Sequence, residues 1–304
     1  MRLKKSIFIA AIGLIFVISG FAQTRTLTVL TEPNAKVWLD DVLRGTSDDG
    51  GKLAIAPVTP GTHKLRVRAD GFGEVSQNLL AAQKGDLKIT LVKTTDQAEL
   101  AYQEAERLAS SNREKAIAAY RKAIGLRPKY AEASLGLARV LSADNDLDGA
   151  LKAVAAARKA RPGYAEASAV EGRIYVTEGD ETKAITAFKR AITEGRGFQP
   201  EANTGLGLLY KEKAEAFGSS GDYEEEEANY LLAVQHFKKA VAQLSGAPDA
   251  VTLYQFLGLA YEKMKKYQDA VAVYEEFLRL FPDNNESEAV RSFIVQLRKQ
   301  MSEQ

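Results

Sequence analysis

The sequence predicts a two-part α+β protein, in which a small antiparallel β-sandwich is followed by an all-α solenoid. Between Arg25 and about Val92, apolar residues alternate with polar ones, which is the period of strands with one buried face. After Thr95 the apolar spacing becomes helical, and similar residues recur at a fixed offset of 34 positions. We therefore expect a β-domain at 25–95 and a helical solenoid at 97–301.

The N-terminus has the three parts of a secretory signal peptide. The positively charged residues Arg2, Lys4 and Lys5 precede an apolar run over 7–18, and small residues follow as far as Ala22. The apolar run is short for a membrane span, which needs about 20 residues. We expect removal of residues 1–22, export to the periplasm or cell envelope, and no integral membrane span after cleavage. The alternative is an uncleaved segment that anchors the protein in the inner membrane.

Overall composition excludes several classes of function. The 41 lysines and arginines nearly cancel the 40 aspartates and glutamates, so no field of one sign favours nucleic-acid binding. There is no cysteine in the sequence, and therefore no disulfide or thiolate site. With 45% hydrophobic residues, the chain has enough apolar material for two cores.

Turn-forming residues separate the predicted strands. Asp70-Gly71 predicts a two-residue hairpin, and Pro60-Gly61 precedes another strand. The order of these motifs resembles that of the PEGA domain: an extended run ending at Asp40, then Gly45-Thr46, Pro60-Gly61 and Gly71-Phe72. The resemblance implies a β-module of the cell envelope, a family without a settled ligand or chemistry.

The helical half contains an internal repeat. Small residues at Ala116, Ala150 and Ala184 are each 34 positions apart, and so are the helix-ending prolines Pro128 and Pro162. A small residue on each helix lets two helices cross closely. The pattern resembles the tetratricopeptide repeat, abbreviated TPR, with about five copies over 97–282. The resemblance implies a scaffold that binds other proteins.

The fourth repeat carries an insertion near 212–232. Gly207 is followed by the next matching alanine, Ala233, after 26 positions instead of the family's 12. We expect two lengthened helices joined at 218–221, and a helix over 287–301 that caps the solenoid. The acidic run Glu224–Glu227 forms either a solvated face or a partner contact.

Catalytic chemistry has few candidate residues. The two histidines, His63 and His236, fall in different domains, so we predict no catalytic, cofactor-binding or metal-binding residue. The polar segment 47–50 is a turn or, alternatively, a calcium loop. Gly205-Leu206-Gly207 lies in a helix and lacks the strand that a nucleotide loop requires, so packing explains these glycines.

The repeat register assigns residues to the inner face of the solenoid. Arg139 and Arg173 are 34 positions apart and should stack as neighbours, where they could hold a carboxylate. Alternatively they pair with an inner row of glutamates and only solvate the groove. The predicted partner-binding residues are Arg139, Arg173, Glu132, Glu166, Leu135, Leu208, Lys211 and Gln255.

The sequence therefore predicts a non-catalytic scaffold of the bacterial cell envelope that binds another protein or peptide in the concave groove of the solenoid. The alternative is an accessory subunit of an envelope enzyme or transport complex, whose PEGA-like domain binds cell-wall polysaccharide. Trp38 is out of phase with Val37 and Leu39, so it points away from the sandwich core. There it packs against a neighbouring domain or stacks on a carbohydrate.

Overall fold

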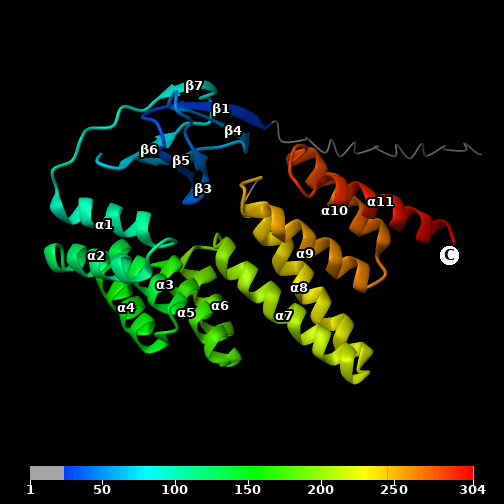
Figure 1. Ribbon diagram of the computed structural model, residues 1–304. Helices are drawn as coiled ribbons and strands as arrows, with labels where there is room; N and C mark the ends of the chain where they lie inside the picture. Colours follow the sequence, from blue (N-terminus) through cyan, green and yellow to red (C-terminus); the bar gives the residue numbers. More distant parts are fainter. Residues whose placement is uncertain (1–23, 245, 304) are drawn as a thin grey trace, which may run out of the picture.

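The computed structural model describes residues 24–244 and 246–303 and shows a β-domain followed by a row of helices (Figure 1). The predicted fold class, a β-sandwich followed by an α-solenoid, is confirmed. The signal-peptide prediction falls on residues 1–22, which lie outside the described residues. Among the described helices, none combines the length and the apolar character that crossing a membrane would require.

Two sheets form the β-domain, with strand orders β4-β1-β7 and β3-β2-β5-β6. The strands are β1 (Arg25–Leu30), β2 (Lys36–Leu39), β3 (Val42–Thr46), β4 (Lys52–Val58), β5 (His63–Arg68), β6 (Val75–Leu79) and β7 (Gly85–Lys88). The expectation of a wholly antiparallel sandwich is wrong in one place, because β7 runs parallel to β1. The chain crosses from one sheet to the other after β6, so β7 joins β1 without a hairpin.

The sandwich core is built from the alternating residues that the sequence indicated. Leu27 and Val29 of β1 and Leu65 and Val67 of β5 are all buried. Trp38 on β2 lies opposite Arg66 on β5 and is only partly buried. The outward face of this sheet therefore presents large polar and aromatic side chains.

One tight turn differs from the prediction. Asp70-Gly71 belongs to a six-residue connection between β5 and β6, so the expected two-residue hairpin there is wrong. Asp40 and Asp41 form the two-residue hairpin instead, between β2 and β3, with positive φ angles of 52° and 62°. Aspartate tolerates this conformation better than most residues, which is why the turn needs no glycine.

The solenoid consists, within the described residues, of antiparallel helix pairs and a last helix. They are α1 (Gln97–Leu108), α2 (Arg113–Leu126), α3 (Ala131–Ala143), α4 (Leu147–Ala160), α5 (Ala165–Glu178), α6 (Glu181–Glu194), α7 (Pro200–Ser220), α8 (Tyr223–Leu244), α9 (Ala250–Lys263), α10 (Tyr267–Leu280) and α11 (Ser287–Ser302). Helices α7 and α8 are the longest pair, and they contain the inserted residues. Their turn lies at Gly221, whose φ of 84° suits glycine.

Glycines and aromatic rings set the spacing of the helices. A Cβ atom at Gly172 of α5 would lie 2.6 Å from the ring of Phe188 on α6, and one at Gly205 of α7 would lie 2.3 Å from the same ring. Phe188 is fully buried between them. The same pairing joins Gly136 to Tyr120 and Gly258 to Tyr274. Each aromatic ring thus fills the space that the absent side chain leaves.

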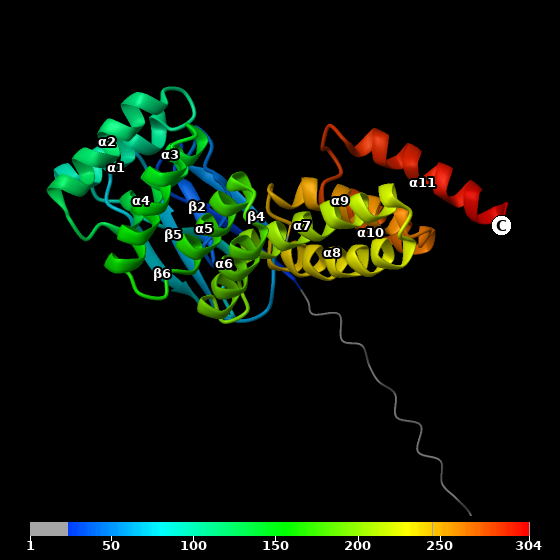
Figure 2. The same ribbon diagram turned by 90° about the horizontal axis from the view of Figure 1, so that it is seen from below.

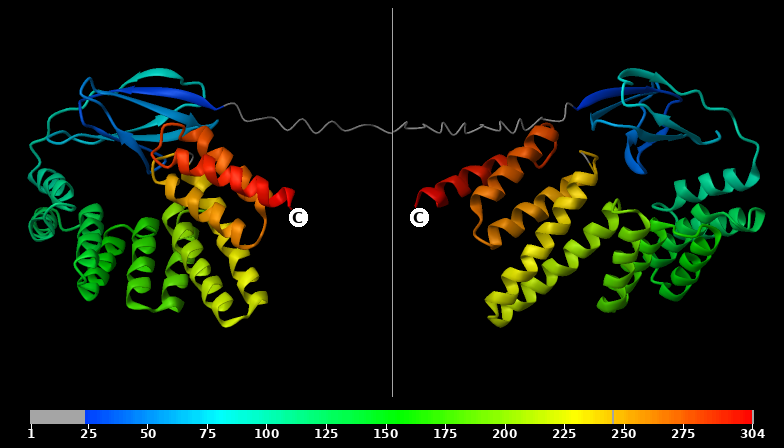
Figure 3. Two further views of the ribbon diagram at one scale, coloured as in Figure 1. Left: turned by 45° about the vertical axis from the view of Figure 1, so that its right-hand side comes forward. Right: turned by 180° about the vertical axis from the view of Figure 1, so that it is seen from behind.

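The β-domain lies across the inner side of the curved row of helices (Figure 1). Seen from below, helices α3 and α5 pass over strands β2, β5 and β6 (Figure 2). The side views show the β-domain reaching from the first helices toward α8 and α9 (Figure 3). The N-terminal domain therefore lies over the inner side of the solenoid.

Candidate functional site

A cavity of about 1350 Å³ lies between the β-domain and the inner helices. Its roof comes from Trp38, Lys64 and Arg66 of the outward sheet face and from the β2–β3 hairpin. Its floor comes from α3, α5, α7 and α9, including Arg139, Glu166, Arg173, Glu201, Leu208 and Phe256. The roof is polar because side chains of a strand alternate between the two faces of a sheet, and the polar ones point away from the sandwich core. The floor forms because each repeat contributes its first helix to the inner side of the solenoid.

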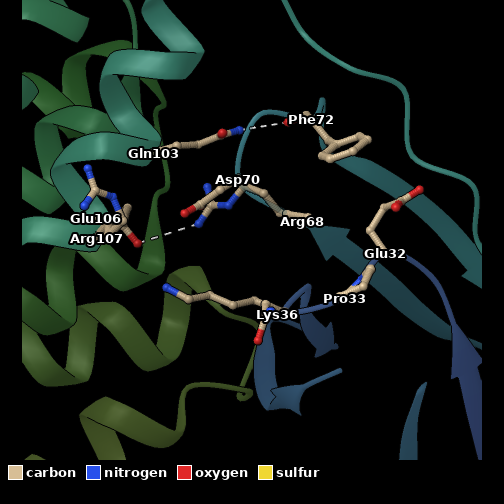
Figure 4. A pocket seen from close by; sticks show the side chains of 11 residues that line it. Glu32, Pro33, Lys36, Arg68, Asp70, Phe72, Gln103, Glu106 and Arg107 are labelled. Carbon is tan, nitrogen blue, oxygen red and sulfur yellow. Dashed lines mark hydrogen bonds and ion pairs between the residues drawn. The ribbon is translucent and has the colours of Figure 1, made fainter. Parts of the chain in front are cut away.

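One end of the roof is joined to α1 through polar contacts. The amide side chain of Gln103 accepts a hydrogen bond from the Gly71 backbone N–H and donates one to the Phe72 carbonyl, both at 2.8 Å. The Arg68 guanidinium lies 4.7 Å from the Tyr102 ring centroid and 3.6 Å from the Glu106 carboxylate. Arg68, Gln103 and Glu106 line a smaller pocket of about 430 Å³ at the junction (Figure 4).

The other end of the roof is joined to the α8–α9 region. Nη1 of Arg44 donates a hydrogen bond of 3.1 Å to the Leu244 carbonyl oxygen, and Nη2 donates one of 3.1 Å to the Pro57 carbonyl oxygen. Burial lowers the pKa of Arg44, and the charge of Asp40 partly opposes that shift. Val42, the first residue after the hairpin turn, is 6% exposed and belongs to the buried cluster formed by α7–α11 and the α8–α9 connection. The β-domain thus bridges the groove between two points of the solenoid.

The two arginines singled out in the sequence meet at one glutamate. Glu201 of α7 lies 3.1 Å from Nη2 of Arg139 and 3.0 Å from Nη1 of Arg173. Burial opposes the charged form of Arg139, but the carboxylates of Glu201 and Glu166 outweigh it and raise the pKa of Arg139. For these residues the geometry favours the alternative in which inner glutamates pair with the arginines.

The other predicted glutamates also lie in the cavity wall. Glu132 pairs with Arg161, whose pKa is raised by that carboxylate against the opposing effect of burial. Glu166 accepts a hydrogen bond of 3.0 Å from the Tyr164 hydroxyl. Burial and the neighbouring Glu166 raise the pKa of Tyr164, so this hydroxyl stays a donor.

Of the four remaining predicted residues, only one lines the cavity. Leu208 lines the cavity as expected. Leu135 does not, because it is 1% exposed and packs in the core of the first repeats. Lys211 pairs with Glu215 at 2.7 Å, and neither Lys211 nor Gln255 contributes to the cavity wall.

The roof is the part of the site that the sequence analysis missed. Trp38 points away from the sandwich core as expected, and its ring carries the Arg66 guanidinium at 4.2 Å from the centroid. Both side chains line the cavity. A usable signal was present, because a tryptophan and the basic residues Lys64 and Arg66 share the outward face of β2 and β5. The outward face of the sheet lies against the groove because of contacts between residues about 200 positions apart. Such contacts cannot be recognised from a local sequence pattern.

The two histidines are each held by partners within their own domain. Nδ1 of His63 lies 2.6 Å from the Asp40 carboxylate, and Nε2 lies 2.8 Å from the Thr59 carbonyl oxygen. His236 contacts Asn203 at 3.1 Å and stacks on Tyr210. Over residues 24–244 and 246–303, no group of three or more potential ligands is arranged to hold a metal ion.

Comparison with known proteins confirms the repeats. Residues 107–174, 165–194 and 251–284 match models of the tetratricopeptide repeat. The solved structure of yeast Tom70 is similar, with a TM-score of 0.54 and 16% identity over 68% of this chain and 41% of Tom70. A structure of the APC/C hetero-tetramer Cut9-Hcn1 matches with a TM-score of 0.50 and 18% identity over 68% of this chain and 37% of that one.

These structural similarities concern the fold alone. The chain spans less than half the length of either solved protein, 41% of Tom70 and 37% of the Cut9-Hcn1 chain. No curated protein sequence matches this chain. The β-domain lies outside the three repeat matches, so its resemblance to the PEGA domain stays a prediction.

Proposed function

Since the helices of this chain include tetratricopeptide repeats, which generally serve as protein-interaction scaffolds, we propose that it binds a segment of another protein in the roofed cavity. The chain then acts as a non-catalytic adaptor, and the cavity is its recognition site. A bound segment would contact the β-domain and the inner helices at the same time. Recognition would therefore depend on both domains being in place.

The size of the cavity is the observation that carries this proposal. Pockets for small molecules have volumes of about 300–1,000 Å³. The cavity here, at about 1350 Å³, exceeds that range. It is lined by residues of four inner helices and of the β-sheet, so an extended segment could contact several repeats at once. A groove that is already formed also lowers the ordering cost of binding.

We also propose that the protein works in the cell envelope. The support is the charged start, the apolar run and the small residues before Ala22. The N-terminal sequence of the protein recovered from cells tests this part separately. A chain that still begins at Met1 and stays with membranes after washing in high salt would favour the anchored alternative.

A cavity-filling substitution tests the proposed binding site. Thr204→Trp together with Leu208→Trp places two indoles in the cavity wall, whereas Leu232→Trp adds one to an exposed position on α8. We expect proteins captured by the wild-type chain and by the Leu232 variant to be lost from the double variant. Equal capture by all three, with unchanged helical circular dichroism, would show that partners bind elsewhere.

A further inference from the structure

The charges on the cavity walls are unevenly balanced. Eight carboxylates and five cationic side chains line the cavity, which leaves an excess of three negative charges. Each of the five cations already has a carboxylate partner, and these cations are Lys64, Arg66, Arg139, Arg161 and Arg173. The cavity therefore offers little uncompensated positive charge to an anionic ligand.

Three of the eight carboxylates, Glu166, Glu212 and Asp249, form no ion pair among the described residues, although the charge of Glu166 also acts on Arg139 and Arg161. Among the described residues, Glu166 accepts a hydrogen bond only from the Tyr164 hydroxyl, and no ion pair or hydrogen bond involves the side chain of Glu212 or Asp249. Asp249 precedes α9 but its side chain does not cap the helix. These carboxylates face the cavity from α5, α7 and the start of α9. Incoming cations would complement them without displacing an existing ion pair.

Apolar side chains lie among these carboxylates. Val176 at the end of α5 is 38% exposed and Phe198 before α7 is 39% exposed, and both line the cavity. Leu208 and Phe256 extend the apolar surface toward α9. Covering partly exposed aliphatic and aromatic groups favours binding, and the polar neighbours fix the orientation.

We propose that the cavity recognises an extended peptide segment in which Lys or Arg residues flank an aliphatic or aromatic residue. This inference rests on the proposed function and names the chemistry of the partner. It differs from the expectation that Arg139 and Arg173 hold a carboxylate, because Glu201 already occupies the position between them. The basic side chains of the segment pair with Glu166, Glu212 and Asp249, and its apolar side chain packs against Leu208 and Phe256.

The test uses three fluorescent peptides of equal length with leucine at the same positions. The remaining positions are lysine in the first peptide, glutamine in the second and glutamate in the third. Titrating each with the full chain and recording fluorescence anisotropy should show the lysine peptide binding about tenfold more tightly than the glutamate peptide. Tighter binding of the glutamate peptide would overturn the inference and leave the proposed function standing.

A matched pair of charge variants locates the binding. Glu166→Gln, Glu212→Gln and Asp249→Asn remove three charges from the cavity, and we expect about five- to tenfold weaker binding of the lysine peptide. Glu224→Gln, Glu225→Gln and Glu227→Gln remove three charges outside it, with a change within about twofold. Equal losses in the two variants would overturn the assignment to the cavity. Binding of none of the peptides would also overturn it, whereas the tryptophan variants test the proposed function independently.

Discussion

The Arg44 guanidinium donates a hydrogen bond of 3.1 Å to the backbone carbonyl of Leu244, joining β3 of the N-terminal domain to the end of α8, 200 residues later. Beside this contact, Val42 packs into the buried cluster of the C-terminal helices. Together with the Gln103 hydrogen bonds at α1, this contact holds the β-domain over the groove.

Val42→Asp should release the C-terminal end of the roof. The substitution removes a buried apolar side chain and places a carboxylate in an apolar cluster, which costs on the order of 2–3 kcal/mol. Because the solenoid and sandwich keep their own cores, we expect unchanged circular dichroism and a larger radius of gyration in small-angle scattering. Val295→Asp, at a 67% exposed position of α11, serves as the control. An unchanged radius in both variants would contradict the contact.

Gly172→Ala and Gly125→Ala should change stability in opposite directions. At Gly172 the new Cβ meets the ring of Phe188, which cannot retreat because Gly205 lies against it from the next repeat. We expect a loss of about 1–3 kcal/mol in the free energy of unfolding. At Gly125 of α2 the added methyl group would meet no atom within 4 Å apart from its chain neighbours and the adjacent helix backbone, so alanine should stabilise by about 0.5 kcal/mol. Equal melting midpoints would show that the repeat register is wrong.

Glu201→Gln should weaken the solenoid slightly and in a salt-dependent way. The variant leaves Arg139 and Arg173 as neighbours without the carboxylate they share. Because the arginine side chains are 38% and 51% exposed, we expect a loss of about 1 kcal/mol. The loss should shrink in high salt, where screening weakens the repulsion. Glu288→Gln, which removes an exposed pair within α11, should have no measurable effect on the same denaturation curves.

His236 should make the folded state less stable as the solution is acidified. Burial first, and then the charges of Lys239 and Lys189, lower the pKa of His236 from 6.5 to about 4. Between these two pKa values the unfolded chain binds more protons at this histidine than the folded chain does. The free energy of unfolding therefore has its full value at pH 7 and decreases as the pH falls toward 4.

The size of this effect can be isolated with one variant. The side chain is half-buried, so solvent screening reduces the contribution to about 1–2 kcal/mol. His236→Gln keeps a polar group opposite Asn203 and removes the titration. The difference in unfolding free energy between wild type and variant should therefore change between pH 7 and pH 4. A constant difference would show that His236 does not titrate abnormally.

Much of the fold follows from local sequence patterns. The two-residue alternation of β1 and β5 and the 34-residue spacing of Ala116, Ala150 and Ala184 depend on short-range geometry, so they are visible in the sequence. The parallel β1–β7 pair and the contacts of Val42 depend on chain crossings and on residues about 200 positions apart. No local period encodes those contacts.

The residues of the candidate site were likewise predictable only where their position depends on the local repeat. The repeat register correctly indicated that Glu132, Arg139 and Arg173 face the groove, since each follows from its place on a first helix. The same register misplaced Leu135, which is 1% exposed and packs in the core of the first repeats although it lies three positions after Glu132 on α3. Whether these residues bind a partner stays a prediction.

A distance measurement across the two domains tests the roofed groove most directly. Because the sequence has no cysteine, spin labels can be attached at Asn78→Cys on β6 and Glu178→Cys at the end of α5 without other changes. Double electron–electron resonance should give one narrow distance distribution, which broadens when Val42→Asp is added. A broad distribution in the labelled protein without Val42→Asp, as expected for two domains on a flexible tether, would contradict the account.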